Sequence, residues 1–309
     1  MTPSLAHGDP LFDIVIPSYN HGRFITTCLD SVIRQTFPNW KCWIIDNYSD
    51  DETDSIVSQF SDSRITYAKF QNHGIIGASR NHGASLGSAK FIAFLDSDDW
   101  WDNNKLAHVL AVTNAECDAV CHDEYWVNST GKHRYVKYGP GKSDLRKFLN
   151  TRGNCLSTSA VVVKRTVFEQ HDGFSTNPDF VTAEDFDLWL RLVNANRQIC
   201  FLNEPLGFFR MHERNSSNNL ETNHAACLSV IKENTTMIPD NPQSHNGMRK
   251  LFSFQYYGYG RSLQKHGLIQ KSFRAFLTSL RWYPLNFRSA VGIALEIAYF
   301  FKTRNLPKR

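Results

Sequence analysis

The feature that most constrains the fold is the regular alternation of short apolar runs with amphipathic segments over the first hundred residues. Four runs rich in β-branched and aromatic residues predict strands: FDIVIPS, KCWIID, RITYAKF and FIAFL. Apolar side chains at helical spacing predict a helix at residues 25–32, and two further segments, 49–60 and 77–89, are compatible with helices. This alternation predicts an α/β fold, with a mostly parallel central sheet that helices cover on both faces.

Polar residues follow the predicted strands at their carboxyl ends. Tyr19 and Asn20 follow the first strand, Asp46 closes the second, and the acids of residues 96–99 follow the fourth. In open α/β sheets, ligands bind beyond the carboxyl ends of the strands. We therefore expect these three clusters, which are far apart in the sequence, to converge on one rim of the sheet.

The segment FLDSDDW sets three carboxylates directly after a buried strand. Like charges this close raise one another's pKa unless a cation lies among them. On an extended strand end Asp96 and Asp98 point to the same side, and two such oxygen ligands suit Mg²⁺ or Mn²⁺ held together with substrate phosphates. The alternative is a set of capping acids before a helix in WWDNNKLAHVL, which explains one aspartate better than three. An EF-hand is excluded, because Trp101 stands where its loop needs glycine.

Residues 102–150 give no clear prediction, whereas the chain after them is more regular. LSTSAVVVKR predicts a strand, TAEDFDLWLRLVNA an amphipathic helix, and EPLGFFRMHERNSS a strand and loop. Thr182 and Asp185 fit a capping box at the start of this helix, which is a purely structural role. Alternatively, Asp185 is a general base, whose pKa the helix N-terminus is expected to lower so that it stays ionised near neutrality.

Two further residues have both a functional and a structural interpretation. His212 could complete a metal site begun by Asp98, or it could be a histidine at the edge of the core without a task. Arg80 is flanked by small residues and could contact a diphosphate through two hydrogen bonds, or it could be an exposed helical arginine. No GxGxxG motif is present, so the glycines do not indicate a dinucleotide site.

In order along the chain, IPSYNHGRF, WIIDNYSDDET, RNHG, FLDSDDW and AEDFDLWLR resemble the family-2 glycosyltransferases, inverting enzymes with the A-type nucleotide-sugar fold. The resemblance runs from about Phe12 to His212. It implies an enzyme that moves a sugar from a nucleoside-diphosphate sugar to an acceptor hydroxyl in one in-line displacement.

The resemblance implies a role for each matching residue. Those expected at the donor nucleotide are Pro17, Tyr19, Asn20, Asp46, Arg80, Asn81, Asp96 and Arg210. Asp98 would be the main ligand of a divalent cation, with Asp96 and His212 beside it. Asp185, preceded by Glu184, would be the catalytic base.

One departure from the family pattern concerns the base of the nucleotide. The family commonly has Asp-Asp-Gly-Ser where this chain has Asp46-Asn47-Tyr48-Ser49. A tyrosine in place of the glycine is expected to narrow the nucleotide pocket. Uridine is nevertheless the expected base, and a saccharide or lipid-linked saccharide in surface polysaccharide, lipopolysaccharide or glycolipid synthesis is the expected acceptor.

Charge divides the chain into two surfaces. Residues 249–309 hold 12 Lys and Arg and one acid, whereas the rest of the chain holds 22 basic and 29 acidic residues. We expect a nucleotide-sugar-binding half at 1–110, an acceptor-binding and catalytic half at 111–220, and a basic aromatic helical region at 221–309. Its longest apolar piece, residues 290–301, is too short to span a bilayer.

The basic region is expected either to bind an anionic membrane surface or to pack as a cap on the catalytic domain; an oligomer contact is a further alternative. No nucleic-acid motif accompanies the charge, and nucleic acid is not an expected partner. The N-terminus shows no secretory signal, and the seven cysteines, which form no CxxC pair, are expected to be reduced thiols. The expected location is therefore cytoplasmic, on the inner face of the membrane.

Two other functions compete with the transferase. A phosphatase could use Asp96 as nucleophile and Asp98 as acid, although Asp99-Trp100 is unusual after such a motif. A nucleotide-binding module without turnover would need neither Asp185 nor His212.

Overall fold

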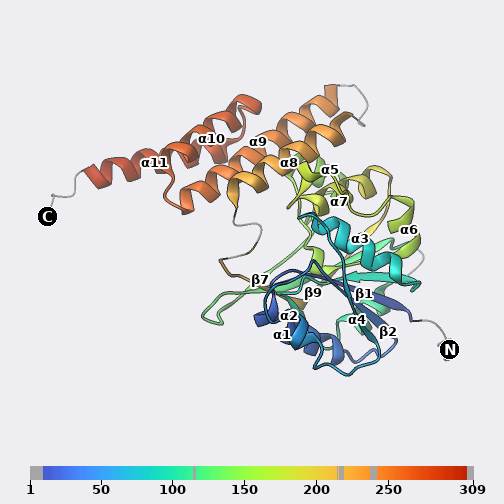
Figure 1. Ribbon diagram of the computed structural model, residues 1–309. Coiled ribbons are helices and arrows are strands. Elements are labelled where there is room, and N and C mark those ends of the chain that lie inside the picture. The colour runs from blue at the N-terminus through green and yellow to red at the C-terminus, as the bar shows by residue number, and fades with distance from the viewer. Residues whose placement is uncertain (1–9, 114–115, 214, 216–218, 237–241, 305–309) are drawn as a thin grey trace.

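The computed structural model describes residues 10–113, 116–213, 215, 219–236 and 242–304. Its centre is a nine-stranded sheet in the order β3-β2-β1-β4-β8-β6-β9-β5, with β7 paired to β6 (Figure 1). The strands are β1 (Phe12–Ser18), β2 (Trp40–Asp46), β3 (Ile65–Lys69), β4 (Phe91–Phe94), β5 (Trp100–Trp101), β6 (Ala119–Val127), β7 (His133–Val136), β8 (Val161–Lys164) and β9 (Ile199–Arg210).

The four strands predicted in the first hundred residues are all present and are parallel to one another. β1 pairs with β2 and β4, and β2 pairs with β3. The second half of the sheet is mixed, because β8 runs antiparallel to both β4 and β6, while β6 and β9 are parallel. Residues 102–150, whose pattern allows no clear prediction, form α4 (Lys105–Val112), β6, β7 and α5 (Leu145–Arg152).

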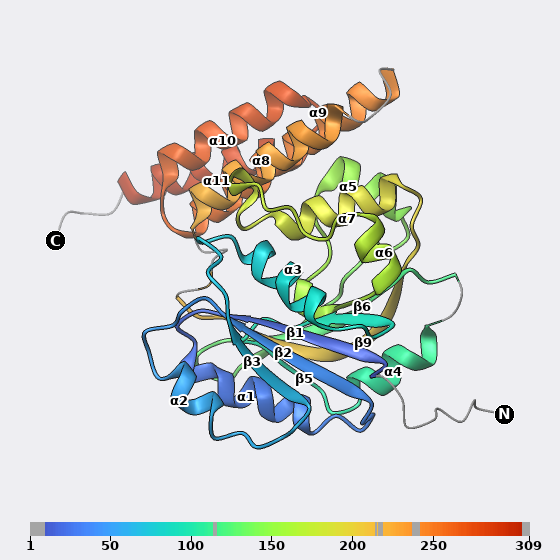
Figure 2. The same ribbon diagram turned by 45° about the vertical axis from the view of Figure 1, so that its right-hand side comes forward.

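Helices cover both faces of the sheet (Figure 2). One face carries α1 (Gly22–Ile33), α2 (Thr53–Val57) and α4, and the other carries α3 (Ile76–Leu86), α5, α6 (Arg165–Gln170) and α7 (Glu184–Asn194). The side chains of β4 alternate between the two cores, with Phe91 and Ala93 in one and Ile92 and Phe94 in the other. The strand is therefore buried on both faces, as its uninterrupted apolar run predicts.

The Gly/Ala-rich composition of α3 has a packing reason. A Cβ added at Gly83 would lie 2.5 Å from a methyl group of Val15 and 2.9 Å from Ile45. Since real Cβ atoms do not approach this closely, the helix can lie against β1 and β2 only with glycine at this position. This close approach holds Arg80, one turn earlier on α3, over the end of the sheet.

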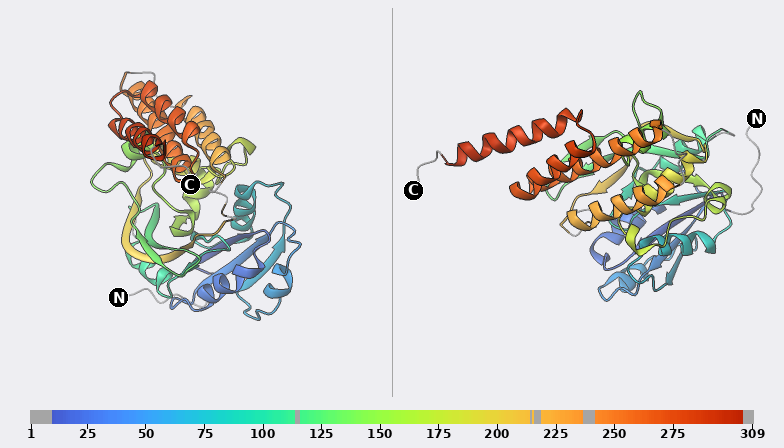
Figure 3. Two further views of the ribbon diagram at one scale, coloured as in Figure 1. Left: turned by 90° about the vertical axis from the view of Figure 1, so that its left-hand side faces the viewer. Right: turned by 90° about the horizontal axis from the view of Figure 1, so that it is seen from above.

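Four helices follow the sheet: α8 (Leu220–Thr236), α9 (Pro242–Lys265), α10 (Ile269–Trp282) and α11 (Phe287–Arg304). α8 and α9 pack on α5 and α7, and Val230, Ile231, Leu251 and Phe252 belong to the core of that face. α10 and α11 extend beyond the sheet (Figure 3). The expectation of a packed cap is therefore correct for α8 and α9. Within the described residues no helix is long and apolar enough to cross a membrane.

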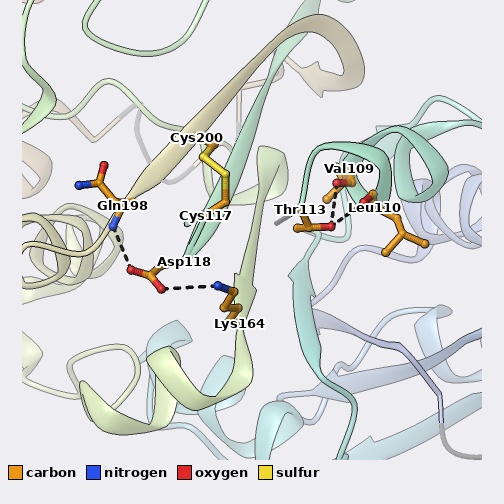
Figure 4. Close-up of a disulfide and its surroundings, with 8 residues drawn as sticks. All are labelled: Val109, Leu110, Thr113, Cys117, Asp118, Lys164, Gln198 and Cys200. Atoms are coloured by element: carbon orange, nitrogen blue, oxygen red, sulfur yellow. Dashed lines mark hydrogen bonds and ion pairs between the residues drawn. A yellow bond between two sulfur atoms is a disulfide. The ribbon is translucent and has the colours of Figure 1, made fainter. Parts of the chain in front are cut away.

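The prediction that all seven cysteines are reduced is wrong for one pair. Cys117 and Cys200 form a disulfide that joins the starts of β6 and β9 (Figure 4). Next to it, Asp118 accepts a hydrogen bond from the backbone of Gln198 and lies 3.8 Å from the ammonium of Lys164. The two strands are neighbours in the sheet, so 83 residues of chain separate cysteines that pair across one strand interval. Sequence spacing gives no sign of such a contact.

Candidate active site

A cleft of about 970 Å³ opens beyond the carboxyl ends of the parallel strands. Eight of the twelve predicted site residues line it: Pro17, Tyr19, Asn20, Arg80, Asp96, Asp98, Glu184 and Asp185. Helices α8 and α9 complete the opposite wall with residues such as Asn223 and Gln255. The expected convergence on one rim is therefore correct for Tyr19, Asn20, Asp96 and Asp98 but not for Asp46, and the C-terminal helices also belong to that rim.

Three predicted donor residues stand behind the cleft rather than in its lining. Asp46 is fully buried, and its carboxylate accepts hydrogen bonds from the backbone N–H and the hydroxyl of Ser49. Asn81 exchanges two hydrogen bonds with the backbone of Phe174 and so ties α3 to the loop after α6. Arg210 contacts the cleft through Asp98, as described below. The first two residues support the walls, and their contacts with a donor stay predictions.

The departure at Tyr48 does not narrow the cleft. Tyr48 is exposed and does not line the cleft, whereas its neighbour Asn47 does. Its φ of 55° lies in the left-handed region, which favours glycine, the residue that the family commonly has here. The expected narrowing is therefore wrong, because the tyrosine replaces a glycine needed for the turn and not for space.

Arg80 is the cation among the acids. Its guanidinium donates to Asp96 at 2.7 Å and to Glu184 at 2.6 Å, and the side chain is 3 % exposed. Burial alone would lower the pKa of Arg80, but the two carboxylates outweigh it and raise the pKa above its ordinary value. The interpretation of Arg80 as an exposed helical arginine is therefore wrong. Both its amino groups are committed to carboxylates, and a contact with a diphosphate stays a prediction.

Asp98 lines the cleft, and His212, a predicted metal ligand, lies outside the lining but contacts Asp98. The Nε2 of His212 lies 2.8 Å from Oδ2 of Asp98, although 114 residues separate them in the sequence. Arg210 donates from Nε to the backbone carbonyl of Asp98, and its guanidinium lies over the ring of Trp100. Burial would raise the pKa of the Asp98 carboxyl, but the hydrogen bond from His212 and the charge of nearby His21 outweigh it, so the pKa is lowered.

The third acid of the motif faces away from the cleft. Asp99 accepts hydrogen bonds from the hydroxyl of Ser159 and the backbone N–H of Arg210, and it is almost fully buried. Burial and the charge of Asp98 raise the pKa of Asp99 well above its usual range. It therefore braces β9 against the turn after β4, which leaves Asp96 and Asp98 as the carboxylates that open to the cleft.

The side chains around Asp98 fit a divalent cation that the protein holds only in part. The described residues contain no group of three or more His, Cys, Asp or Glu side chains placed to hold a metal. Asp98 nevertheless lines the cleft with Nε2 of His212 2.8 Å from its carboxylate, whereas Oδ1 of Asp96 is engaged by Arg80. Mg²⁺ and Mn²⁺ are commonly held by one or two protein ligands, with substrate phosphates and water completing the shell. The residues fit such a site and not a closed protein cage.

Asp185, in the first turn of α7, lines the same cleft and directly follows Glu184. Arg80 joins Asp96 to Glu184, and we call the Asp98 side and the Asp185 side of this bridge the two ends of the cleft. Asn154 donates to its Oδ2 at 3.0 Å, and the backbone N–H of Phe186 donates to Oδ1. The expected capping box is wrong: Ala183 precedes the helix, and Thr182 has a φ of 81° and makes no capping bond.

The expected lowering of the Asp185 pKa is also wrong. Burial, followed by the charge of Glu184, raises the pKa of Asp185 to about 7, against the smaller opposing effect of Arg80. The helix N-terminus is too weak to reverse the loss of water and an adjacent carboxylate. A general base is most efficient when its pKa lies near the working pH, so this shift suits the predicted role.

Three residues at the site were missed. His21 lies 2.7 Å from the hydroxyl of Ser97, and burial lowers its pKa. Asn215 donates to Arg210 and approaches Asp98 at 3.4 Å, and Asn154 holds Asp185. His21 directly follows the Tyr-Asn turn and Asn215 follows His212 by three residues, so proximity could have indicated both. Nothing in the sequence around Asn154 indicates its role.

Comparison with known proteins places this geometry in a family. A family model described as "Glycosyl transferase family 2" matches residues 13–172. The Escherichia coli protein named UDP-Glc:alpha-D-GlcNAc-diphosphoundecaprenol beta-1,3-glucosyltransferase WfgD is 36% identical over 196 residues, which cover 61% of this chain and 72% of that protein. The putative teichuronic acid biosynthesis glycosyltransferase TuaG of Bacillus subtilis is 26% identical, over 68% of this chain and 82% of its own.

Solved structures show the same fold. Residues 1–349 of Staphylococcus aureus TarS in complex with UDP-GlcNAc match with a TM-score of 0.64 at 16% identity, over 94% of this chain and 92% of that one. The match covers only 49% of a longer TarS chain. The mannosyltransferase PcManGT of Pyrobaculum calidifontis, in complex with GDP-Man and Mn²⁺, matches with a TM-score of 0.63 at 14% identity, over 96% and 83% of the two chains. These likenesses show the A-type fold.

Proposed function

The chain belongs to glycosyl transferase family 2 and is a glycosyltransferase, and on this premise we propose that it transfers a sugar, with inversion, from a UDP-sugar to a hydroxyl of a lipid-linked saccharide. This family membership excludes the two alternatives, a phosphatase and a nucleotide-binding module without turnover. One observation carries the proposal: Asp185, a carboxylate with a pKa of about 7, lines the same cleft as Asp98, whose carboxylate contacts His212. A base and an electrostatic site for a leaving diphosphate are what this reaction needs.

The choice of donor rests on relatives and on the cleft. WfgD is named for UDP-Glc, and TarS has been solved with UDP-GlcNAc. Pro17, Tyr19 and Asn20 provide the wall where a nucleotide would lie, and Tyr19 is 54% exposed, free to stack on a base. A cleft of about 970 Å³ is of the size that encloses a ligand of this class.

Asp185 is the residue that we propose as the base. Its carboxylate takes the proton of the acceptor hydroxyl while the hydroxyl oxygen forms a bond to the anomeric carbon. The bond from that carbon to the diphosphate oxygen breaks at the same time, so UDP leaves and the anomeric configuration inverts. Asn154 holds the carboxylate, and Arg80 orders Glu184 beside it.

Asp98 and His212 are the residues that we propose to hold a divalent cation, with Asp96 near it. When bound, such a cation supplies Lewis-acid stabilisation of the negative charge that develops on the departing diphosphate. The lowered pKa of Asp98 keeps its carboxylate ionised and able to bind. The PcManGT complex with Mn²⁺ supports the choice of cation.

A thermal-shift screen tests the donor and the cation together. UDP-, GDP- and dTDP-sugars would be compared with Mn²⁺, with Mg²⁺ and with EDTA. We expect a UDP-sugar with Mn²⁺ to raise the melting temperature by about 5 °C at a hundredfold excess over its Kd, and EDTA to remove most of that shift. If no nucleotide sugar raised the melting temperature, the proposed function would be overturned. If the shift were equally large in EDTA, the proposed cation site would be overturned.

We also propose that the chain works at the inner face of the cell membrane, attached through residues 249–309. Phe287, Val291 and Leu295 are exposed at four-residue spacing on α11, which carries basic residues as well. Such a face can lie in the interface of an anionic membrane. Removing residues 249–309 would not test this attachment cleanly, because it would also remove Leu251 and Phe252 from the core and so destabilise the fold.

A better test replaces exposed side chains only. A variant with Phe287→Ser, Val291→Ser and Leu295→Ser should pellet less with phosphatidylglycerol vesicles at low salt, and its melting temperature should be unchanged. Pelleting equal to that of the unaltered protein would reject the membrane proposal.

We further propose that residues 1–110 bind the donor and that residues 111–220 carry the acceptor side. Residues 221–309 would then cap the acceptor side.

A further inference from the structure

A second cavity, of about 850 Å³, lies between α5, α9 and the start of α11. Four cations line it, and no acid is among its lining residues: Lys147, Arg152, Lys250 and Arg288. Within the described part of the chain none of the four forms an ion pair with a carboxylate. Four uncompensated positive charges in one concavity attract a ligand with several negative charges.

Aromatic rings hold two of these cations in place. The guanidinium of Arg152 lies 4.1 Å from the centre of the Phe254 ring, and the ammonium of Lys250 lies 5.3 Å from that of Tyr283. The planar guanidinium of Arg152 meets the ring with its face, so its N–H groups, which point outward from its edge, can still donate to a ligand. The side chains that line the cavity are therefore suited to bind an anionic ligand.

This cavity continues into the active-site cleft. Arg152, Asn154 and Phe254 line both. Asn154 is the residue that donates to Asp185. A ligand that places its hydroxyl at the proposed base can therefore reach the four cations through its next chemical group.

The outer rim of the cavity is apolar. Leu285 and Phe287 line it and are 74% and 72% exposed. From Phe287 the exposed apolar face continues along α11 to Val291 and Leu295. α11 points away from the sheet, so this face leads out of the molecule (Figure 3). An anion alone would have no use for such a rim, whereas an anion attached to a hydrocarbon chain would.

We propose that this cavity binds the diphosphate of a lipid-linked acceptor. The acceptor sugar would lie at Asp185, the diphosphate at the four cations, and the first isoprenoid units along Leu285, Phe287 and α11. The identity of the sugar end rests on the proposed function, but binding of a prenyl diphosphate does not depend on turnover. The occupant is thus one amphiphile that bridges the membrane and the cleft.

Geranyl diphosphate tests the cavity without knowledge of the sugar. Its binding to the full chain would be measured by calorimetry with UDP and Mn²⁺ at saturation, so that the donor side is filled. We expect Lys147→Ser with Arg288→Ser, both exposed, to weaken binding by about ten- to fiftyfold. A matched control is Lys265→Ser with Arg274→Ser, which removes two exposed cations outside the cavity and should leave binding unchanged.

Three further probes separate head, tail and membrane. Inorganic pyrophosphate should bind more weakly than geranyl diphosphate, and geraniol should show no difference between the unaltered protein and the variant. Equal affinity of the unaltered protein and the Lys147/Arg288 variant for geranyl diphosphate would overturn the proposal. So would a variant that loses only its binding to phosphatidylglycerol vesicles, since the cations would then serve the membrane surface.

The same experiment distinguishes this proposal from the proposed function. Binding of UDP with Mn²⁺ is measured first and without geranyl diphosphate. If UDP binds and geranyl diphosphate is insensitive to the variant, the acceptor cavity is wrong and the transferase proposal stands. If UDP does not bind but geranyl diphosphate binds through Lys147 and Arg288, the donor assignment fails and the cavity stands.

Discussion

The two ends of the cleft treat the same functional group in opposite ways. At one end the hydrogen bond from His212 lowers the pKa of Asp98 despite its burial. At the other end burial and the charge of Glu184 raise the pKa of Asp185 to about 7. Two carboxylates in one cleft are thus prepared for two tasks, one to stay ionised and one to exchange a proton.

Arg80 explains how the two ends remain separate. Its guanidinium joins Asp96, next to the first end, to Glu184, next to the second. The buried cation neutralises the carboxylates that flank each functional group, and it makes no hydrogen bond to Asp98 or Asp185 itself. The difference teaches that the positive charge the acid cluster requires is an internal arginine, which leaves Asp98 and Asp185 for cation and substrate.

The largest expected effect comes from Asp185→Asn, which removes the base and keeps the side-chain volume. We expect kcat to fall by about 10²–10⁴-fold, while the Kd for UDP with Mn²⁺ stays within twofold. Radiolabelled sugar transfer and calorimetry measure the two quantities. Turnover at the unaltered rate would remove Asp185 from its proposed role and end the contrast between the two acids.

Asp98→Asn acts on the other end. We expect the Kd for UDP in the presence of Mn²⁺ to rise by about 10–100-fold, since a charged ligand is replaced by a neutral one. In EDTA the variant and the unaltered protein should bind UDP alike. Asp172→Asn is the control, because Asp172 is exposed and asparagine accepts its left-handed φ of 56°. If Mn²⁺ made no difference to the unaltered protein, Asp98 would hold no cation.

Local patterns were sufficient to predict the parallel half of the fold. β1, β2 and β4 are buried apolar runs and β3 is a half-buried one, so short-range periodicity is enough to predict all four. The mixed half was predicted only in part: the strands β8 and β9 follow from local patterns, but β6 does not, and its pairing with β8 and β9 joins segments far apart in the chain. The disulfide between Cys117 and Cys200 was missed for the same reason.

Eight of the twelve predicted site residues line the cleft, but the sequence did not predict their electrostatics. Asp98, Asp185 and Arg80 all line the cleft, as the order of motifs indicated. The sequence places Asp185 at a helix start and predicts a lowered pKa, but it does not show that Glu184 and the surrounding packing dominate. It likewise shows an arginine between glycines in α3, but not that two acids from distant elements bind it.

The raised pKa of Asp185 also predicts a pH-dependent change in stability. The ordinary pKa is 3.8 and the folded one about 7, so the folded protein binds this proton more tightly than the unfolded chain does. The cost of the ionised carboxylate is absent below pH 3.8, grows as the pH rises and is complete above about 7. Asp185→Asn should therefore stabilise the protein at pH 8 by about 1–2 kcal/mol, discounted for partial exposure, and less at pH 5. Urea unfolding at both pH values measures this difference, and an equal gain at both would contradict it.

The smallest expected effect is the most specific to the second end of the cleft. Asn154 donates to the ionised form of Asp185 and lowers its pKa, so Asn154→Ala should raise that pKa above 7 by about half a unit to one unit. The rate at pH 7 should fall about two- to fivefold and recover at pH 9, where the base is ionised in either protein. Asn150→Ala is the matched control, since Asn150 bonds Arg146 and Asn194 and does not line the cleft. A merely structural role for Asn154 would lower the rate equally at every pH, and the two carboxylates would then differ for reasons that this hydrogen bond does not supply.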